Sequence, residues 1–178
     1  MHLNLNMQRK INVNTKRKIA VATAVGAAAV AATALAVPAH AATPRTLQNV
    51  SNNALCLDAA APNNGSVGPG AQVTAWHCNG GANQKWTVVG NGTIRSAANT
   101  TLCLDAAAPN GNVGPGAQVS AWTCNGGSNQ RWTFSGGLIV NVSNPNLCLD
   151  AAAPNGDVGP GANVTAYPCN GNNNQRWF

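Results

Sequence analysis

The sequence contains no glutamate, and its only acidic residues are the four aspartates Asp58, Asp105, Asp150 and Asp157. Glycoside hydrolysis normally requires two carboxylates that face one bond. Three of these aspartates occur once in each of three similar segments, so the repeat keeps them apart. The shortage of acids therefore argues against a glycosidase.

Histidine is also scarce, because His77 is the only one beyond residue 41. One histidine cannot build a zinc site if the cysteines are committed to disulfides, and a Ser-His-Asp triad would have to break the repeat. We therefore expect no catalysis, no bound metal and no cofactor.

Basic residues are few outside the N-terminus, since five of the ten Lys and Arg residues precede residue 19. Beyond residue 41, five basic residues stand against four acids, which leaves a net charge of +1. The high isoelectric point of the whole chain therefore does not indicate a nucleic-acid partner.

The N-terminal segment has the order of a secretory signal peptide. Basic residues come first, an uncharged Ala/Val-rich run follows over residues 19–37, and Ala39-His40-Ala41 fits an A-x-A cleavage site. A signal anchor is the alternative, because the run is long enough to span a membrane. Alanine is only weakly apolar, however, and the run leads straight into small residues without a positively charged stop. We expect cleavage after residue 41 and a secreted, extracellular product without membrane insertion.

Six cysteines in an exported chain are most simply three disulfides. Fifteen pairings are possible, and the simplest one that gives each similar segment the same bond is Cys56 with Cys78, Cys103 with Cys124, and Cys148 with Cys169. Each would close a loop of a little over twenty residues and contribute about 3 kcal/mol in the chain-entropy model.

One segment of about thirty residues occurs three times with small changes, beginning CLDAAAP and ending NQKW or NQRW. Matching Cys and Trp residues recur every 45–47 residues, and such a period indicates one supersecondary unit used repeatedly. We expect a single domain over residues 42–178, with repeats at approximately 42–88, 89–134 and 135–178.

The local patterns are those of strands. Short β-prone runs at 72–76 (QVTAW), 85–89 (KWTVV), 130–134 (QRWTF) and 138–142 (LIVNV) are separated by clusters of Gly, Asn and Pro. No long stretch of helical periodicity follows the leader. The predicted fold class is all-β with threefold internal symmetry.

The repeated motifs resemble those of a known family. C-L-D, an aromatic residue two positions before the second Cys, and N-Q-x-W occur three times in register. The chain therefore resembles the ricin B-chain-like lectins and the family 13 carbohydrate-binding modules with QxW repeats. The resemblance implies a β-trefoil of three four-stranded repeats, with one potential sugar pocket in each repeat and no metal.

The residues themselves also indicate a site. If the strands around Cys56 and Cys78 pair antiparallel with the two cysteines opposite each other, Asp58 falls opposite Trp76. Alternation then turns Leu57 into the core. The C–H face of a pyranose can lie on such a ring while its hydroxyls donate to the carboxylate. The same reasoning pairs Asp105 with Trp122 and Asp150 with Tyr167.

The Asn-Gln pairs complete the candidate set. In an extended N-Q-x-W segment the Gln shares a face with the Trp and the Asn takes the other face, which favours Asn83, Asn129 and Asn174 as ligand residues. For Gln84, Gln130 and Gln175 the resemblance implies the pocket edge, whereas alternation turns them inward. The tryptophans Trp86, Trp132 and Trp177 are predicted to be packing residues.

The three repeated aspartates have an alternative role, because an aspartate can bind the backbone of the turn that follows it. Ligand binding is favoured, since three of the four acids occupy this one place. The sequence thus predicts a secreted, non-catalytic and monomeric carbohydrate-binding protein with up to three equivalent sites for galactose-type or xylan/arabinan-type glycans. The alternative is a β-trefoil that binds a protein partner, such as a protease inhibitor, through one protruding loop that should break the symmetry.

Overall fold

The computed structural model describes residues 42–61, 66–153 and 157–178, and the predicted signal peptide lies outside them. Within these ranges the regular elements are strands and three-residue 3-10 helices, as expected for an all-β protein. No helix in the described part is long and apolar enough to cross a membrane.

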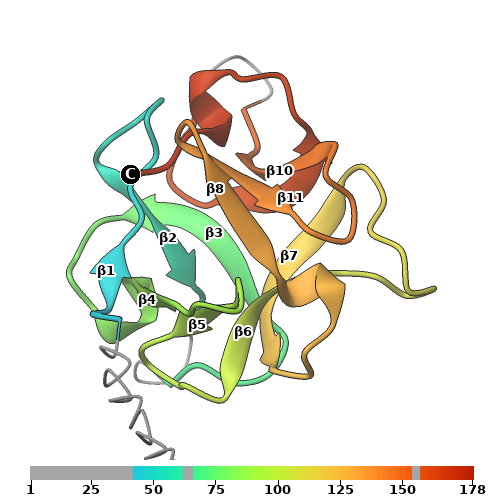
Figure 1. The fold of residues 1–178 in the computed structure, drawn as a ribbon. Helices are drawn as coiled ribbons and strands as arrows, with labels where there is room; N and C mark the ends of the chain where they lie inside the picture. The colour runs from blue at the N-terminus through green and yellow to red at the C-terminus, as the bar shows by residue number, and fades with distance from the viewer. Residues whose placement is uncertain (1–41, 62–65, 154–156) are drawn as a thin grey trace, which may run out of the picture. The chain divides into compact units, whose positions relative to one another are not determined.

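The elements recur in the same order in each repeat (Figure 1). The first repeat contains β1 (Arg45–Thr46), β2 (Leu55–Ala59), β3 (Ala71–His77), η1 (Ala82–Gln84) and β4 (Lys85–Val88). The second contains β5 (Ile94–Ser96), β6 (Leu102–Ala106), β7 (Ala117–Thr123), η2 (Ser128–Gln130) and β8 (Trp132–Ser135). The third contains β9 (Leu138–Asn141), β10 (Leu147–Ala151), β11 (Ala162–Pro168) and η3 (Asn173–Gln175). Trp177 then bridges Asn49, at the place of a twelfth strand.

The long strands of the three repeats close on one another. β3 pairs with β7, β7 with β11, and β11 with β3, all antiparallel and over two residue pairs at each junction. Each junction places two alanines opposite each other: Ala71 and Ala121, Ala117 and Ala166, Ala162 and Ala75. The observed threefold closure therefore matches the repeat in the sequence.

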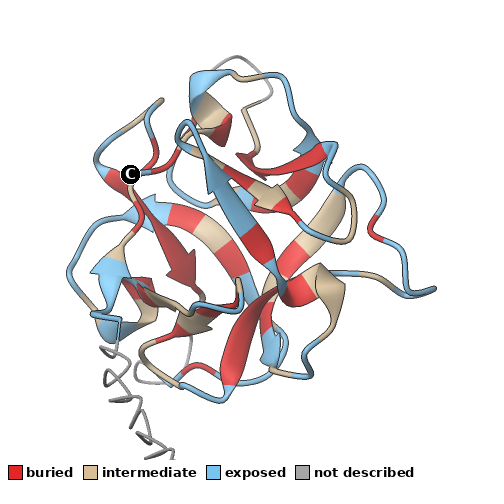
Figure 2. Ribbon diagram, viewed as in Figure 1, coloured by how far each residue is buried: buried red, intermediate tan, exposed pale blue. Residues whose placement is uncertain are grey.

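The core follows from strand alternation. Leu57, Val73 and Ala75 point inward and are fully buried, and Figure 2 shows buried residues along the interior strands. The tryptophans of the N-Q-x-W motifs are buried too, and Trp86 Nε1 donates a hydrogen bond to the Leu57 carbonyl oxygen at 2.8 Å. Trp132 and Trp177 make the same bond in their repeats. Their predicted packing role is confirmed.

The disulfides are those expected within each repeat. Cys56 bonds Cys78, Cys103 bonds Cys124, and Cys148 bonds Cys169. The predicted strand register is wrong by two residues, however. Asp58 was expected opposite Trp76, but it lies opposite Thr74, and Trp76 lies opposite Cys56. Cys78 follows the end of β3 and its amide donates to the Ala54 carbonyl, so the disulfide crosses diagonally.

The same correction applies to the other repeats, in which Asp105 lies opposite Ser120 and Asp150 lies opposite Thr165. A slip of two residues leaves every side chain on the face that alternation predicted. The aspartate and the aromatic residue therefore share a face as diagonal neighbours, at about 7–8 Å between backbone positions.

Candidate functional site

Each repeat holds an aspartate at the end of its CLD strand, almost completely buried. Asp58 follows Leu57, whose carbonyl is fixed by the core residue Trp86. One carboxylate oxygen, Oδ2, accepts hydrogen bonds from Asn83 Nδ2 at 3.0 Å and from Gln84 Nε2 at 2.8 Å. The other oxygen, Oδ1, accepts none from the described residues, which leaves it to receive a ligand hydroxyl. Asp105 and Asp150 are held identically by their Asn-Gln pairs.

The 3-10 helix η1 explains how consecutive residues reach one carboxylate. The N-Q-x-W segment was expected to be extended, which would point Asn83 and Gln84 in opposite directions. It instead turns through η1 over Ala82–Gln84 before β4 begins. The turn brings both side-chain amides to Asp58, and η2 and η3 do the same at Asp105 and Asp150.

The glutamine is a structural brace. Gln84 is fully buried, and its Nε2 also donates to the His77 carbonyl at 2.8 Å while its Oε1 accepts the Asn79 amide at 2.8 Å. Its hydrogen-bonding groups are therefore used within the protein, as are those of Gln130 and Gln175. The inward orientation is the one observed, so these residues hold the aspartate in place.

The asparagine is half-buried and lies nearer the surface. Besides its bond to Asp58, Asn83 Nδ2 approaches the Ala59 carbonyl at 3.4 Å. The amide nitrogen therefore faces the protein, and the side-chain oxygen is the atom left for a ligand. Asn129 and Asn174 repeat this arrangement.

Burial raises the pKa of Asp58 above its ordinary value, although the hydrogen bonds from Gln84 and Asn83 act in the opposite direction. Asp105 and Asp150 are shifted in the same direction for the same reasons. No arginine or lysine forms an ion pair with any of them in the described part of the chain. Among the described residues, only the neutral amides of the Asn-Gln pairs donate side-chain hydrogen bonds to the three carboxylates, so an ionised aspartate keeps its negative charge uncompensated.

The aromatic residue beside each aspartate is exposed, in contrast to the core tryptophans. Trp76, Trp122 and Tyr167 have 46%, 48% and 50% of their surface accessible. We call the Asp58/Trp76 pair the first site, Asp105/Trp122 the second and Asp150/Tyr167 the third. An apolar ring held open to solvent beside a carboxylate offers one surface for stacking and one for hydrogen bonding.

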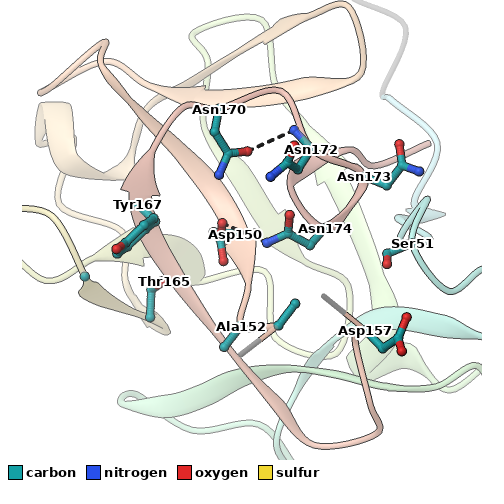
Figure 3. A pocket seen from close by; sticks show the side chains of 12 residues that line it. Ser51, Asp150, Ala152, Asp157, Thr165, Tyr167, Asn170, Asn172, Asn173 and Asn174 are labelled. Carbon is teal, nitrogen blue, oxygen red and sulfur yellow. Dashed lines mark hydrogen bonds between the residues drawn. The ribbon is translucent and has the colours of Figure 1, made fainter. Parts of the chain in front are cut away.

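Hollows open at the first and third sites. The hollow at the third site is a cavity of about 930 Å³. In Figure 3 Asp150 lies in the middle of this cavity, with Tyr167 on one side and Asn174 on the other. Asp157, the fourth acid, also lines it. The hollow at the first site is smaller, about 410 Å³, and includes Asp58, Thr74 and Trp76. Thr74 and Thr165, the residues opposite the aspartates, thus belong to the site surface.

Each site also includes a glycine from another repeat, which the sequence did not predict: Gly161 at the first site, Gly70 at the second, and Gly116 in the lining of the third cavity. Gly161 lies beside Trp76, because a β-carbon added there would be 3.2 Å from the ring, and Gly70 stands in the same relation to Trp122 at 3.1 Å. The Gly161 amide also donates to the Ala75 carbonyl at 2.8 Å. The signal in the sequence was the thrice-repeated GPGA, whose second glycine has a positive φ in every copy.

No group of three or more His, Cys, Asp or Glu residues suited to a metal occurs among the residues that the structure describes. The site chemistry is therefore that of carboxylate, amide and aromatic groups.

Residues 43–177 match the ricin-type beta-trefoil lectin domain family. The chain belongs to this lectin family. The β-trefoil fold expected from the repeats is confirmed, and the family is one of carbohydrate-binding domains, which points away from catalysis.

Solved structures agree with the family assignment. The lectin domain of the Vibrio vulnificus hemolysin/cytolysin, solved with N-acetyl-D-lactosamine bound, is 28% identical with a TM-score of 0.61, over 76% of this chain and 91% of that one. ThreeFoil, a designed protein with threefold symmetry, is 29% identical with a TM-score of 0.61, over 74% and 94% of the two chains. A sequence match to the V. vulnificus (strain CMCP6) cytolysin is 39% identical over 59 residues, which is 33% of this chain but only 12% of the cytolysin.

Proposed function

We propose that this protein is a secreted, non-catalytic lectin that binds glycans through three sites, one in each repeat. The observation that carries the proposal is the threefold recurrence of one arrangement. In each copy an almost buried aspartate keeps one oxygen free beside a half-exposed aromatic ring. A site with such a small polar anchor and an open apolar face suits a sugar ring better than an extended polypeptide.

The chemistry of binding follows from the geometry. The C–H face of a pyranose packs on Trp76, and one or two hydroxyls donate to Asp58 Oδ1. A hydrogen bond to an ionised acceptor is stronger than a neutral one. Asn83 Oδ1 accepts a further hydroxyl at the edge of the site. The ligand classes that we propose are galactose-type glycans and xylan- or arabinan-type polysaccharides.

Secretion and multivalency belong together in this proposal. The three disulfides are consistent with an oxidising compartment, and the N-terminal sequence has the order of a signal peptide. Single open sites bind sugars weakly, whereas three on one rigid domain gain about 10² to 10⁴ in avidity on a repetitive surface if the geometry permits. We propose that the protein acts as a monomer on polysaccharides or glycan-coated surfaces.

A glycan array that includes galactosides, N-acetyl-D-lactosamine, xylan and arabinoxylan tests the proposal. The control is a Trp76→Ala/Trp122→Ala/Tyr167→Ala variant, which should keep the fold because these rings are exposed. We expect glycan binding by the wild type and its loss in the variant. If the folded wild type binds no glycan, the proposal fails and a protein partner becomes the better hypothesis.

A further inference from the structure

The turns that hold the aspartates are themselves braced from the next repeat, but not in all three cases. Asn141 Nδ2 donates to the Asn129 carbonyl at 3.1 Å, and Asn49 Nδ2 donates to the Asn174 carbonyl at 3.0 Å. Both bracing asparagines are fully buried. They reach the η2 and η3 turns, which carry the Asn-Gln pairs of the second and third sites.

The bracing position is defined by strand pairing. Asn141 lies opposite Trp132 and Asn49 lies opposite Trp177. In the first repeat the residue opposite Trp86 is Ser96. The three positions are therefore equivalent in the fold, but the one that faces the first site holds a serine where the other two hold an asparagine.

Ser96 cannot replace the asparagine. It is fully buried, and its hydroxyl has no hydrogen-bond partner among the described residues. The asparagines also accept a backbone amide on their other side, Ser143 N at 3.0 Å for Asn141 and Ser51 N at 3.0 Å for Asn49. Each asparagine thus links a site turn to the segment behind it, and Ser96 makes neither link.

We propose that Asn49 and Asn141 are positioning residues for the third and second sites, and that Ser96 leaves the first site with the loosest turn and the weakest binding. The effect on affinity rests on the proposed function. The reason is preorganisation: the η1 turn holds Asn83 and Gln84 against Asp58, so movement of the turn disorders the carboxylate that a ligand must meet. The three sites are accordingly unequal despite their matching residues.

Hydrogen exchange tests the bracing without any ligand. The amides of Asn79, Asn125 and Asn170 donate to the site glutamines at 2.8–2.9 Å and report on the three turns separately. We expect Asn79 to exchange roughly tenfold faster than the other two, as the loss of about one net hydrogen bond implies. Ser96→Asn should slow Asn79, and Asn141→Ser should accelerate Asn125 while leaving Asn170 unchanged.

A titration then separates positioning from stability. The indole N–H signals of Trp76 and Trp122 report on the first and second sites during addition of N-acetyl-D-lactosamine or xylotriose. We expect half-saturation at a several-fold lower concentration for Trp122 than for Trp76. Ser96→Asn should bring the two together, and Asn141→Ser should weaken only the Trp122 response, a selectivity that a general loss of stability would not produce.

The outcomes are distinguishable. Equal exchange of the three reporter amides in the wild type, or exchange of Asn125 that Asn141→Ser does not change, overturns the bracing. If hydrogen exchange is as expected but neither Ser96→Asn nor Asn141→Ser changes the half-saturation of the indole signals, the role of the bracing residues in affinity is overturned. Expected exchange without an indole shift for any glycan overturns the proposed function and keeps the bracing. If Ser96→Asn does not fold, Asn141→Ser and Asn49→Ser decide by themselves.

Discussion

At the scale of single residues, the same side-chain type serves two purposes at different depths. Trp86 is buried, and its indole holds the strand that carries Asp58, whereas Trp76 keeps 46% of its surface exposed beside that aspartate. Alternation along the strands predicted this division. It placed Trp76 on the face opposite the core residues, and it placed Trp86 on the inward face. Matched substitutions of the two tryptophans should therefore have opposite consequences.

Trp86→Ala should destabilise the protein by about 3–5 kcal/mol, because it removes a large core side chain and a buried hydrogen bond. Trp76→Ala should change the free energy of unfolding by less than about 1 kcal/mol while weakening glycan binding at the first site about tenfold, on the order of 1 kcal/mol for a lost aromatic contact. Chemical denaturation and glycan titration of both variants check this. Equal destabilisation by the two substitutions would show that Trp76 is a packing residue.

The site aspartates should give folding and binding opposite pH dependences. Burial raises their folded-state pKa, so the folded protein binds protons more readily than the unfolded chain. Stability should therefore increase as the pH falls from the raised folded-state pKa toward the ordinary value for aspartate, and decrease again on the return. Glycan binding should decline over the same fall, because a protonated carboxyl is the weaker acceptor. Thermal unfolding and binding measured across this range would contradict the account if both declined together.

At the scale of elements, the sequence predicted the strands, their faces and the disulfide pairing, but it missed the register and the turns. The predicted register was wrong because the bonded cysteines were assumed to lie directly opposite each other. In the structure Cys78 lies past the end of β3 and reaches Cys56 diagonally. Side-chain orientation survived, since the slip was two residues. The η1 turn was missed because the N-Q-x-W segment was taken as extended from its first residue, although the turn signal Gly80-Gly81 stands directly before Ala82.

Contacts between repeats could not be predicted from any one segment. Gly161 and Trp76 are far apart in the sequence, and only the closure of β3, β7 and β11 brings them into contact. The repeated GPGA was visible, but nothing in it indicates which ring it will meet. The bracing by Asn49 and Asn141 is of the same kind.

The three equivalent glycines provide a matched test of these contacts. Gly70, Gly116 and Gly161 all have φ between +81° and +86°, so replacement by alanine should cost each about 1–2 kcal/mol of backbone strain. A β-carbon at Gly70 or Gly161 also presses on the Trp122 or Trp76 ring, whereas one at Gly116 meets nothing within 4 Å.

Gly70→Ala should therefore weaken the second site and Gly161→Ala the first. Gly116 lines the third cavity but a β-carbon there meets no ring, so Gly116→Ala should lower stability with the smallest effect on glycan binding of the three. Unfolding and glycan titration of the three variants compare them directly. The composite nature of the sites would be refuted by three variants that lose stability alike and bind alike.

At the scale of the whole molecule, symmetry sets the spacing of the sites and the disulfides keep each repeat intact. Avidity should depend on the number of working sites. Binding to an immobilised polysaccharide should exceed binding to its monovalent fragment by about 10² to 10⁴, and Tyr167→Ala should remove much of that gain with little effect on the fragment's affinity for the other sites. Surface binding and solution titration of the same preparations measure both. A surface affinity equal to that for the fragment would mean that one site acts alone.

The measurement that tests the account most directly is a crystal structure with the tightest-binding glycan of the array. We predict a sugar ring lying on Trp76, Trp122 or Tyr167, with a hydroxyl within hydrogen-bonding distance of Oδ1 of the aspartate in the same repeat. A sugar bound away from all three aspartate–aromatic pairs would contradict the account.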